Sequence, residues 1–80
     1  MDTFSTPRQK ESLGDYIKRL RTALNMSQNE LASLAGIHLH SLGKIERGLT
    51  TRLSLKTRRG LAKVLSIPID YLEALSKGDR

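Results

Sequence analysis

Apolar residues near the start of the chain recur at the spacing of a helix. The steps are of four, three and four residues, at Leu13, Ile17, Leu20 and Leu24. Because residues three or four apart share one side of a helix, the pattern predicts a helix from about Ser12 to Ala23 or Leu24 with a single apolar stripe. The basic residues at positions 18, 19 and 21 fall beside that stripe.

Two short helices joined at a glycine are predicted next. The sequence SQNE at residues 27–30 has the spacing of a capping box, in which serine and glutamate each bond the other's backbone, and it predicts a helix that runs to about residue 35. Gly36 follows, and glycine readily adopts the left-handed conformation that ends many helices. A third helix is expected over about residues 38–47, before the glycine at position 48.

The remaining apolar positions predict two more helices and no sheet. Ser54 can cap a fourth helix, and Pro68 can occupy the first turn of a short fifth one. Only SIPID, at residues 66–70, resembles the alternation of a strand, and its proline argues against that. The last two helices would carry Leu55, Leu61, Ala62, Leu65, Leu72 and Leu75. The sequence therefore predicts an all-α protein of five helices.

The length of 80 residues suits one domain with a small core. We expect a flexible arm over residues 1–11, which are mostly polar, a domain over residues 12–76 and a tail over residues 77–80. The chain has no cysteine, which excludes disulfides and thiolate metal ligands. No apolar run approaches the roughly 20 residues that cross a bilayer, and the first residues lack the apolar core of a signal peptide, so we expect a cytoplasmic protein without a membrane segment.

Positive charge is concentrated in the body of the chain. Lys and Arg number 14 against 8 Asp and Glu, and residues 8–63 hold 12 of the basic residues but only 4 of the acidic ones. Such a field favours an anionic partner, either nucleic acid or an acidic membrane surface, although a solvated basic surface is common without any partner.

The two helices joined at Gly36 have the arrangement of a helix-turn-helix, which ordinary helical hairpins share. A longer pattern extends this arrangement, and it reads LGDYIKRLRTALNMSQNELASLAGIHLHSLGKIERG followed by SLKTRRGLAKVLSIPIDYL. This pattern closely resembles the Cro/repressor type of helix-turn-helix domain, the family that includes lambda-type phage repressors. The resemblance covers roughly residues 13–75. It implies a compact, lambda-repressor-like domain without a cofactor. It also implies a sequence-specific transcriptional regulator, with repression favoured, that binds a palindromic operator in double-stranded DNA as a homodimer on the nucleoid.

In the family that the chain resembles, the third helix lies in the major groove of DNA. At about 100° per residue, Leu42 and Ile45 lie about 60° apart on the buried side of this helix, with His38 between them in angle. The opposite side and the first turn supply the base-contacting candidates, which are His38, Leu39, His40, Gly43, Lys44 and Arg47.

Each candidate has a chemical role and a plainer alternative. Lys44 can donate to guanine, Arg47 and His40 can donate to a base or a phosphate, and Leu39 can pack on a thymine methyl group. Gly43 weakens a helix by about 1 kcal/mol relative to alanine, but it would let the backbone approach DNA closely. The plainer alternative is that the cations are only solvated and that one exposed leucine has no function.

Other positions have roles that the resemblance implies. Gln28, at the start of the second helix, resembles the family's phosphate-binding glutamine, and the N-terminus of that helix adds backbone donors. Further phosphate-binding candidates are Ser27, Ser41, Thr51 and Arg52. The resemblance also pairs Arg21 with Glu46, and the alternative is two unconnected surface charges worth under ~1 kcal/mol.

The third and fourth helices depart from the family pattern. His38 stands where Ser or Thr usually caps the third helix, so the cap is weaker or is supplied by the imidazole. Arg58 and Gly60 stand where the fourth helix usually has a leucine and a longer side chain, which predicts a helix that is underpacked or leans on a partner. A homodimer surface on the last two helices is therefore expected, made of Val64, Ile69, Tyr71 and Leu75.

Other functions have weaker support. The sequence HLH at residues 38–40 suggests a metal pair, but residues two apart point about 160° from each other on a helix, and no third ligand completes a set. No catalytic set is visible for an enzyme, and aromatic residues, at 4%, are too few for an RNA-stacking surface. The strongest alternative is an antitoxin-like or adaptor module that uses the same fold to hold another protein, for which an outward Leu39 would serve.

Overall fold

The computed structural model describes residues 5–76, and all regular structure in this range is helical. The helices are α1 (Leu13–Ala23), α2 (Gln28–Ala35), α3 (Leu39–Glu46), α4 (Leu55–Leu65) and α5 (Ile69–Ser76). They confirm the predicted all-α fold of five helices. The predicted tail at residues 77–80 and the first four residues of the predicted arm lie outside the described residues. Within residues 5–76, no helix combines the length and apolar character needed to span a membrane.

Serine side chains cap the starts of α1, α2 and α4. The hydroxyl groups of Ser12, Ser27 and Ser54 accept the backbone N–H three residues further on, at 3.1, 3.0 and 3.2 Å. The predicted capping box at Ser27 is complete, since its own N–H donates to the Glu30 carboxylate at 2.8 Å. His38 occupies the N-cap position of α3, but its side chain makes no capping hydrogen bond. The imidazole therefore does not replace the usual serine or threonine, and α3 lacks the side-chain cap of the other three helices.

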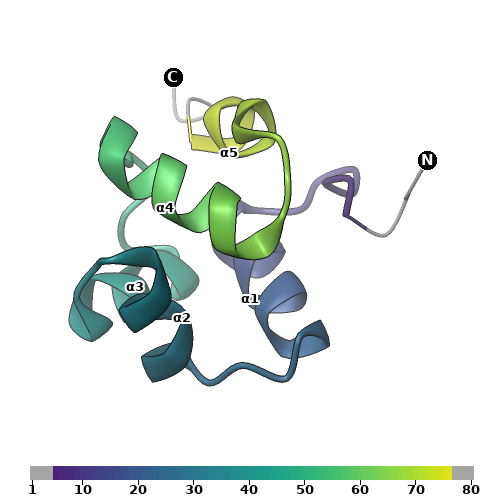
Figure 1. Cartoon of the computed structure of the whole chain (residues 1–80). Coiled ribbons are helices and arrows are strands. Elements are labelled where there is room, and N and C mark those ends of the chain that lie inside the picture. The colour runs from purple at the N-terminus through teal and green to yellow at the C-terminus, as the bar shows by residue number, and fades with distance from the viewer. Residues whose placement is uncertain (1–4, 77–80) are drawn as a thin grey trace.

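The helices pack so that α2 and α3 form a helix-turn-helix. The chain turns at Gly36, whose φ of 74° is left-handed and costs glycine little. α3 packs against α1 and α2, α4 packs against α2, and α5 packs against α4 and α1. Figure 1 shows α2 and α3 together at the lower left, with α4 above them and α5 at the top.

The core draws side chains from all five helices. The largest fully buried side chains are Tyr16, Ile17, Leu31, Leu42, Leu61 and Leu72. The apolar stripe of α1 ends earlier than predicted, because Leu24 is its C-cap residue and is 50% exposed. Tyr16, which that stripe does not include, is fully buried instead.

The two unusual residues of α4 tighten its packing. A Cβ on Gly60 would lie 2.3 Å from the carbonyl oxygen of Ala35, so only glycine lets α4 come this close to the end of α2. Arg58 donates to the carbonyl oxygen of Leu53 at 2.8 Å, and its Nη2 atom lies 3.9 Å from the carboxylate of Glu73 in α5. The prediction of an underpacked α4 is therefore wrong, because a longer side chain at position 60 would collide with α2.

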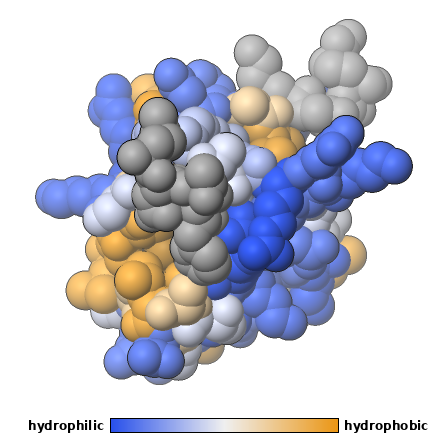
Figure 2. Space-filling view, turned by 90° about the vertical axis from the view of Figure 1, so that its right-hand side faces the viewer, coloured by the Kyte–Doolittle hydropathy of each residue, from blue (hydrophilic) through white to orange (hydrophobic). Residues whose placement is uncertain are grey.

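The segment at residues 5–11 lies against α1. Arg19 donates to the Glu11 carboxylate at 2.8 and 2.9 Å, and the Tyr16 hydroxyl donates to the carbonyl oxygen of Ser5. Burial raises the pKa of Tyr16 to about 12, so the phenol keeps the proton that it donates. From Ser5 onward, the expected arm is thus bonded to the domain. Figure 2 shows the side of the molecule where this segment lies, with hydrophilic residues next to a hydrophobic area.

Candidate nucleic-acid interface

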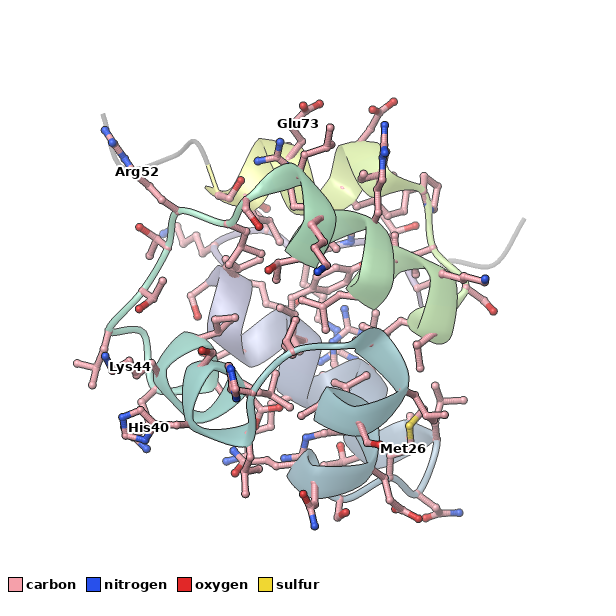
Figure 3. All side chains as sticks on the ribbon, turned by 60° about the vertical axis from the view of Figure 1, so that its left-hand side comes forward. Met26, His40, Lys44, Arg52 and Glu73 are labelled. Atoms are coloured by element: carbon pink, nitrogen blue, oxygen red, sulfur yellow. The ribbon has the colours of Figure 1, made fainter. Side chains whose placement is uncertain are left out.

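α3 has one buried side and one exposed side. Leu42 and Ile45 are buried, as the helical wheel predicts. The opposite side carries four exposed residues, which are Leu39, His40, Lys44 and Arg47. Figure 3 shows His40 and Lys44 projecting away from the body of the protein. The side of α3 predicted to meet DNA is therefore open to solvent at these four positions.

The prediction that His38 turns toward the core is wrong. The residue is exposed, and its φ of −72° and ψ of 142° are extended, not helical. An N-cap residue lies outside the regular helix, so the step of about 100° per residue does not apply to it. His38 and His40 therefore both lie at the surface near the start of α3. In residues 5–76, no three His, Cys, Asp or Glu side chains gather in a way that could hold a metal ion.

Gly43 faces outward, but its backbone is covered. The residue is buried, although it belongs to the predicted outward side. The Nη1 atom of Arg47 lies 3.3 Å from the point where a Cβ of Gly43 would stand. The side chain one turn further along α3 thus lies over Gly43, and a close approach of DNA to the Gly43 backbone stays a prediction.

A polar hollow of about 250 Å³ lies beside α3, between it and the start of α4. Ser41 and Arg52, two of the predicted phosphate-binding residues, line it together with Lys44. Thr51 is not part of this lining, whereas its neighbour Thr50 is. In Figure 3, Arg52 projects on the same side of the molecule as His40 and Lys44. The fold therefore brings predicted base-contacting and phosphate-binding residues to one surface.

The start of α4 adds polar groups that the sequence had not indicated for this surface. Ser54 and Thr57, from the cap and the first turn of α4, line the same hollow. Helix N-termini attract anions, so the prediction of Ser54 as a cap was a signal that could have indicated this site. All charged residues between positions 47 and 69 are basic, which adds to the positive field around the hollow.

A buried ionic network holds the C-terminal end of α3. Arg21 donates from Nε and Nη2 to the Glu46 carboxylate at 2.7 and 2.9 Å, and from Nη1 to the carbonyl oxygen of Met26 at 2.7 Å. The hydrogen bond to Glu46 is the main cause that raises the pKa of Arg21. Gln28 donates its side-chain amide to the same carboxylate at 3.0 Å. The structure thus contains the ion pair that the resemblance implied, and the network joins α1, the start of α2 and the end of α3.

The helix-turn-helix family model matches residues 17–72, most of the chain. The chain belongs to the helix-turn-helix family.

Several proteins share this helix-turn-helix domain. The chain is 37% identical over 68 residues to an uncharacterized transcriptional regulator in the ATPase CF(0) region of Rhodospirillum rubrum, covering 84% of this chain and 62% of that protein. Among solved structures, SinR of Bacillus subtilis in complex with DNA is 33% identical with a TM-score of 0.71, over 76% of this chain and 97% of that one. The restriction-modification controller protein C.AhdI of Aeromonas hydrophila is 37% identical with a TM-score of 0.68, over 75% of this chain and 89% of that one. The helix-turn-helix chain thus spans about three fifths of the length of the Rhodospirillum rubrum regulator.

The two phosphate-binding candidates at the start of α2 already bond within the helix-turn-helix domain. Gln28 is half-buried and donates to Glu46, and the hydroxyl of Ser27 accepts from the N–H of Glu30. A primary amide has two hydrogens and a hydroxyl has one, so each side chain has a further hydrogen to donate. Contacts of these residues with a phosphate stay a prediction.

The residues predicted for a dimer surface lie at the edge of the helix-turn-helix core. All four are half-buried and pack against it, namely Val64, Ile69, Tyr71 and Leu75. Each therefore contributes to its own fold and also leaves some apolar surface exposed. A dimer contact at these residues stays a prediction.

Proposed function

We propose that this protein is a sequence-specific regulator of transcription that binds double-stranded DNA and acts as a repressor. The observation that carries the proposal is the exposed side of α3 beside the polar hollow that Arg52 lines. One surface thus offers donors for base edges and for phosphates, the two kinds of contact that sequence-specific binding uses. The solved complex of SinR with DNA, which contains a similar domain, supports the proposal.

In the proposed complex, α3 lies in the major groove. An α-helix with its side chains is about 10–12 Å in diameter, and the groove is about 12 Å wide. Lys44 and Arg47 donate to base edges, with guanine O6 and N7 as the natural acceptors. Leu39 packs on a thymine methyl group, and His40 and His38 donate to bases near the start of the helix.

Phosphate contacts flank α3 on both sides in this proposal. Ser41 and Arg52 bind one phosphate at the hollow, where the start of α4 adds its positive end, and Thr51 binds beside them. Ser27 and Gln28 bind a second phosphate at the start of α2. Because Gln28 also bonds Glu46, this phosphate would be linked through the buried network to the end of α3.

We further propose that two copies bind a palindromic operator as a homodimer, in the cytoplasm on the nucleoid. The dimer surface would consist of Val64, Ile69, Tyr71 and Leu75. Dimers of such domains contact half-sites about 34 to 36 Å apart. The domain measures 29 × 27 × 20 Å, so one copy is smaller than the distance between two such half-sites.

Selection of binding sites from random duplexes tests the proposal directly. We expect a palindrome with half-sites about one helical turn apart. If about six phosphates are neutralised, the logarithm of the binding constant should fall against the logarithm of salt concentration with a slope near −5, or about a thousandfold between 50 and 200 mM. Recovery of no preferred sequence, or an affinity that salt does not change, would reject the proposal.

A second candidate function is to hold another protein. Leu39 is 46% exposed and Leu49, just after α3, is 68% exposed, and a partner protein could cover both. SinR has also been solved as a SinR/SinI protein complex. Stoichiometric capture of a protein by the nuclease-treated chain, together with no preference among duplexes, would favour this candidate. The family is one of DNA-binding regulators and not of enzymes.

A further inference from the structure

Arg47 ends α3 and folds back over it. It is the C-cap residue, its backbone is still helical, and its N–H donates to the carbonyl oxygen of Gly43 at 3.0 Å. Side chains on a helix lean toward its N-terminus, so that of Arg47 covers the turn that contains Gly43. Its Nη1 atom lies 3.3 Å from the Cβ position of Gly43. Leaving aside Leu42, Lys44 and the nearby backbone of α3, no other heavy atom of the described residues lies within 4 Å of that point.

We propose that Gly43 is a specificity-determining residue that acts by positioning Arg47, an inference that rests on the proposed binding of DNA by α3. Because position 43 has no side chain, the Nη1 atom of the Arg47 guanidinium can lie over the exposed side of α3. Residues three and four positions apart are neighbours on a helix, so this places the guanidinium next to His40 and Leu39. In that position Arg47 donates to a base edge, and Gly43 itself does not touch DNA.

The cost of glycine in a helix supports this role. Glycine inside a helix lowers stability relative to alanine, so a function that requires it explains its presence. A methyl group at position 43 would stand 3.3 Å from the Arg47 guanidinium, which would then have to move by a few tenths of an ångström. The end of an arginine side chain can make that move cheaply, so the fold would tolerate alanine. The contact with a base edge would suffer, because it depends on a fixed hydrogen-bonding geometry.

A double-mutant cycle on the whole chain tests the inference. The four proteins are the unmodified chain, Gly43→Ala, Arg47→Ala and the double variant, each titrated with the duplex that the unmodified chain selects and with a random duplex. For the selected duplex, we expect Arg47→Ala to weaken binding about tenfold and Gly43→Ala about fivefold. We expect the double variant to bind no more weakly than Arg47→Ala alone. Thermal unfolding should show Gly43→Ala at least as stable as the unmodified chain, since alanine favours the helix.

The cycle separates the possible explanations. If Gly43→Ala causes the same loss with and without the arginine, the methyl group acts on DNA directly and the inference is overturned. If the unmodified chain selects a sequence and Gly43→Ala binds that sequence equally well, Gly43 has no role in specificity. The proposed function would then still stand. A chain that selects no duplex at all overturns both.

Discussion

Glu46 accepts hydrogen bonds from Arg21 and Gln28 at a buried junction of three helices. Replacing Glu46 with Ala would leave the Arg21 guanidinium buried without its counter-ion. We expect the free energy of unfolding to fall by about 3 to 5 kcal/mol, which urea denaturation can measure.

The matched control removes both charges, as Arg21→Met with Glu46→Leu. Apolar replacements of similar volume often restore stability at buried ion pairs, so this double variant should recover much of the loss. A remaining deficit would come from the carbonyl group of Met26 and the amide of Gln28, which lose their partners. If the double variant were less stable than Glu46→Ala, the unpaired charge would not be the cause.

Lys44 and Arg52 lie in the same hollow, but we expect different effects when each is replaced. Lys44→Ala should relax the preference at one base pair by about 1 to 3 kcal/mol, because a base-edge contact is lost. Arg52→Ala should weaken binding to all duplexes alike, because a phosphate contact is lost. The slope of the logarithm of the binding constant against the logarithm of salt concentration should become about 1 less negative. Titrations with selected and random duplexes at several salt concentrations measure both. Equal losses on both duplexes for both variants would contradict this division of roles.

At the scale of the elements, the segment at residues 5–11 depends on Glu11 and Arg19. The hydrogen bond from Arg19 lowers the pKa of Glu11 below its usual value of 4.5. A carboxyl group whose pKa is lowered by folding stabilises the fold above its unfolded pKa and loses that contribution as the pH falls through its folded pKa. We expect Glu11→Gln to be less stable at pH 7 by about 1 kcal/mol or less, with the difference closing as the pH falls below 4.5.

Unfolding midpoints from pH 7 to pH 3, measured in chemical denaturant, test this expectation. Arg19→Gln provides the control, because without Arg19 the Glu11 carboxylate keeps only its hydrogen bond from the Arg8 N–H at 2.9 Å, and the substitution at Glu11 should then change less. A difference between Glu11→Gln and the unmodified chain that stays constant over the whole pH range would show that the carboxylate charge is not responsible.

At the scale of the whole molecule, the proposed homodimer depends on apolar residues that are half-buried within one copy. Val64→Glu would place a charge on both halves of a symmetric interface, and we expect the dimer dissociation constant to rise at least about a hundredfold. Lys63→Glu puts the same side chain on the neighbouring exposed position and should leave the dimer intact. Sedimentation with and without DNA distinguishes them. A monomer at high concentration for the unmodified chain in both conditions would count against the homodimer.

The sequence by itself determined the helices and most of their starts. The number of helices, the caps at Ser27 and Ser54 and the turn at Gly36 all follow from residues a few positions apart. Helix formation and capping depend on such near neighbours, so a single chain is enough to predict them. The same periodicity correctly placed Lys44 and His40 on the exposed side of α3.

Only the tertiary structure decided what depends on distant residues or on the path of a long side chain. Spacing could not show that Gly60 meets the carbonyl oxygen of Ala35, because that contact needs the crossing of α2 and α4. It could not show that Arg47 lies over Gly43, because several rotamers of arginine fit the same helix. The hollow beside α3 exists because a loop and the start of another helix fold against it. A sequence pattern specifies which side of a helix is exposed, whereas packing specifies what each exposed atom can reach.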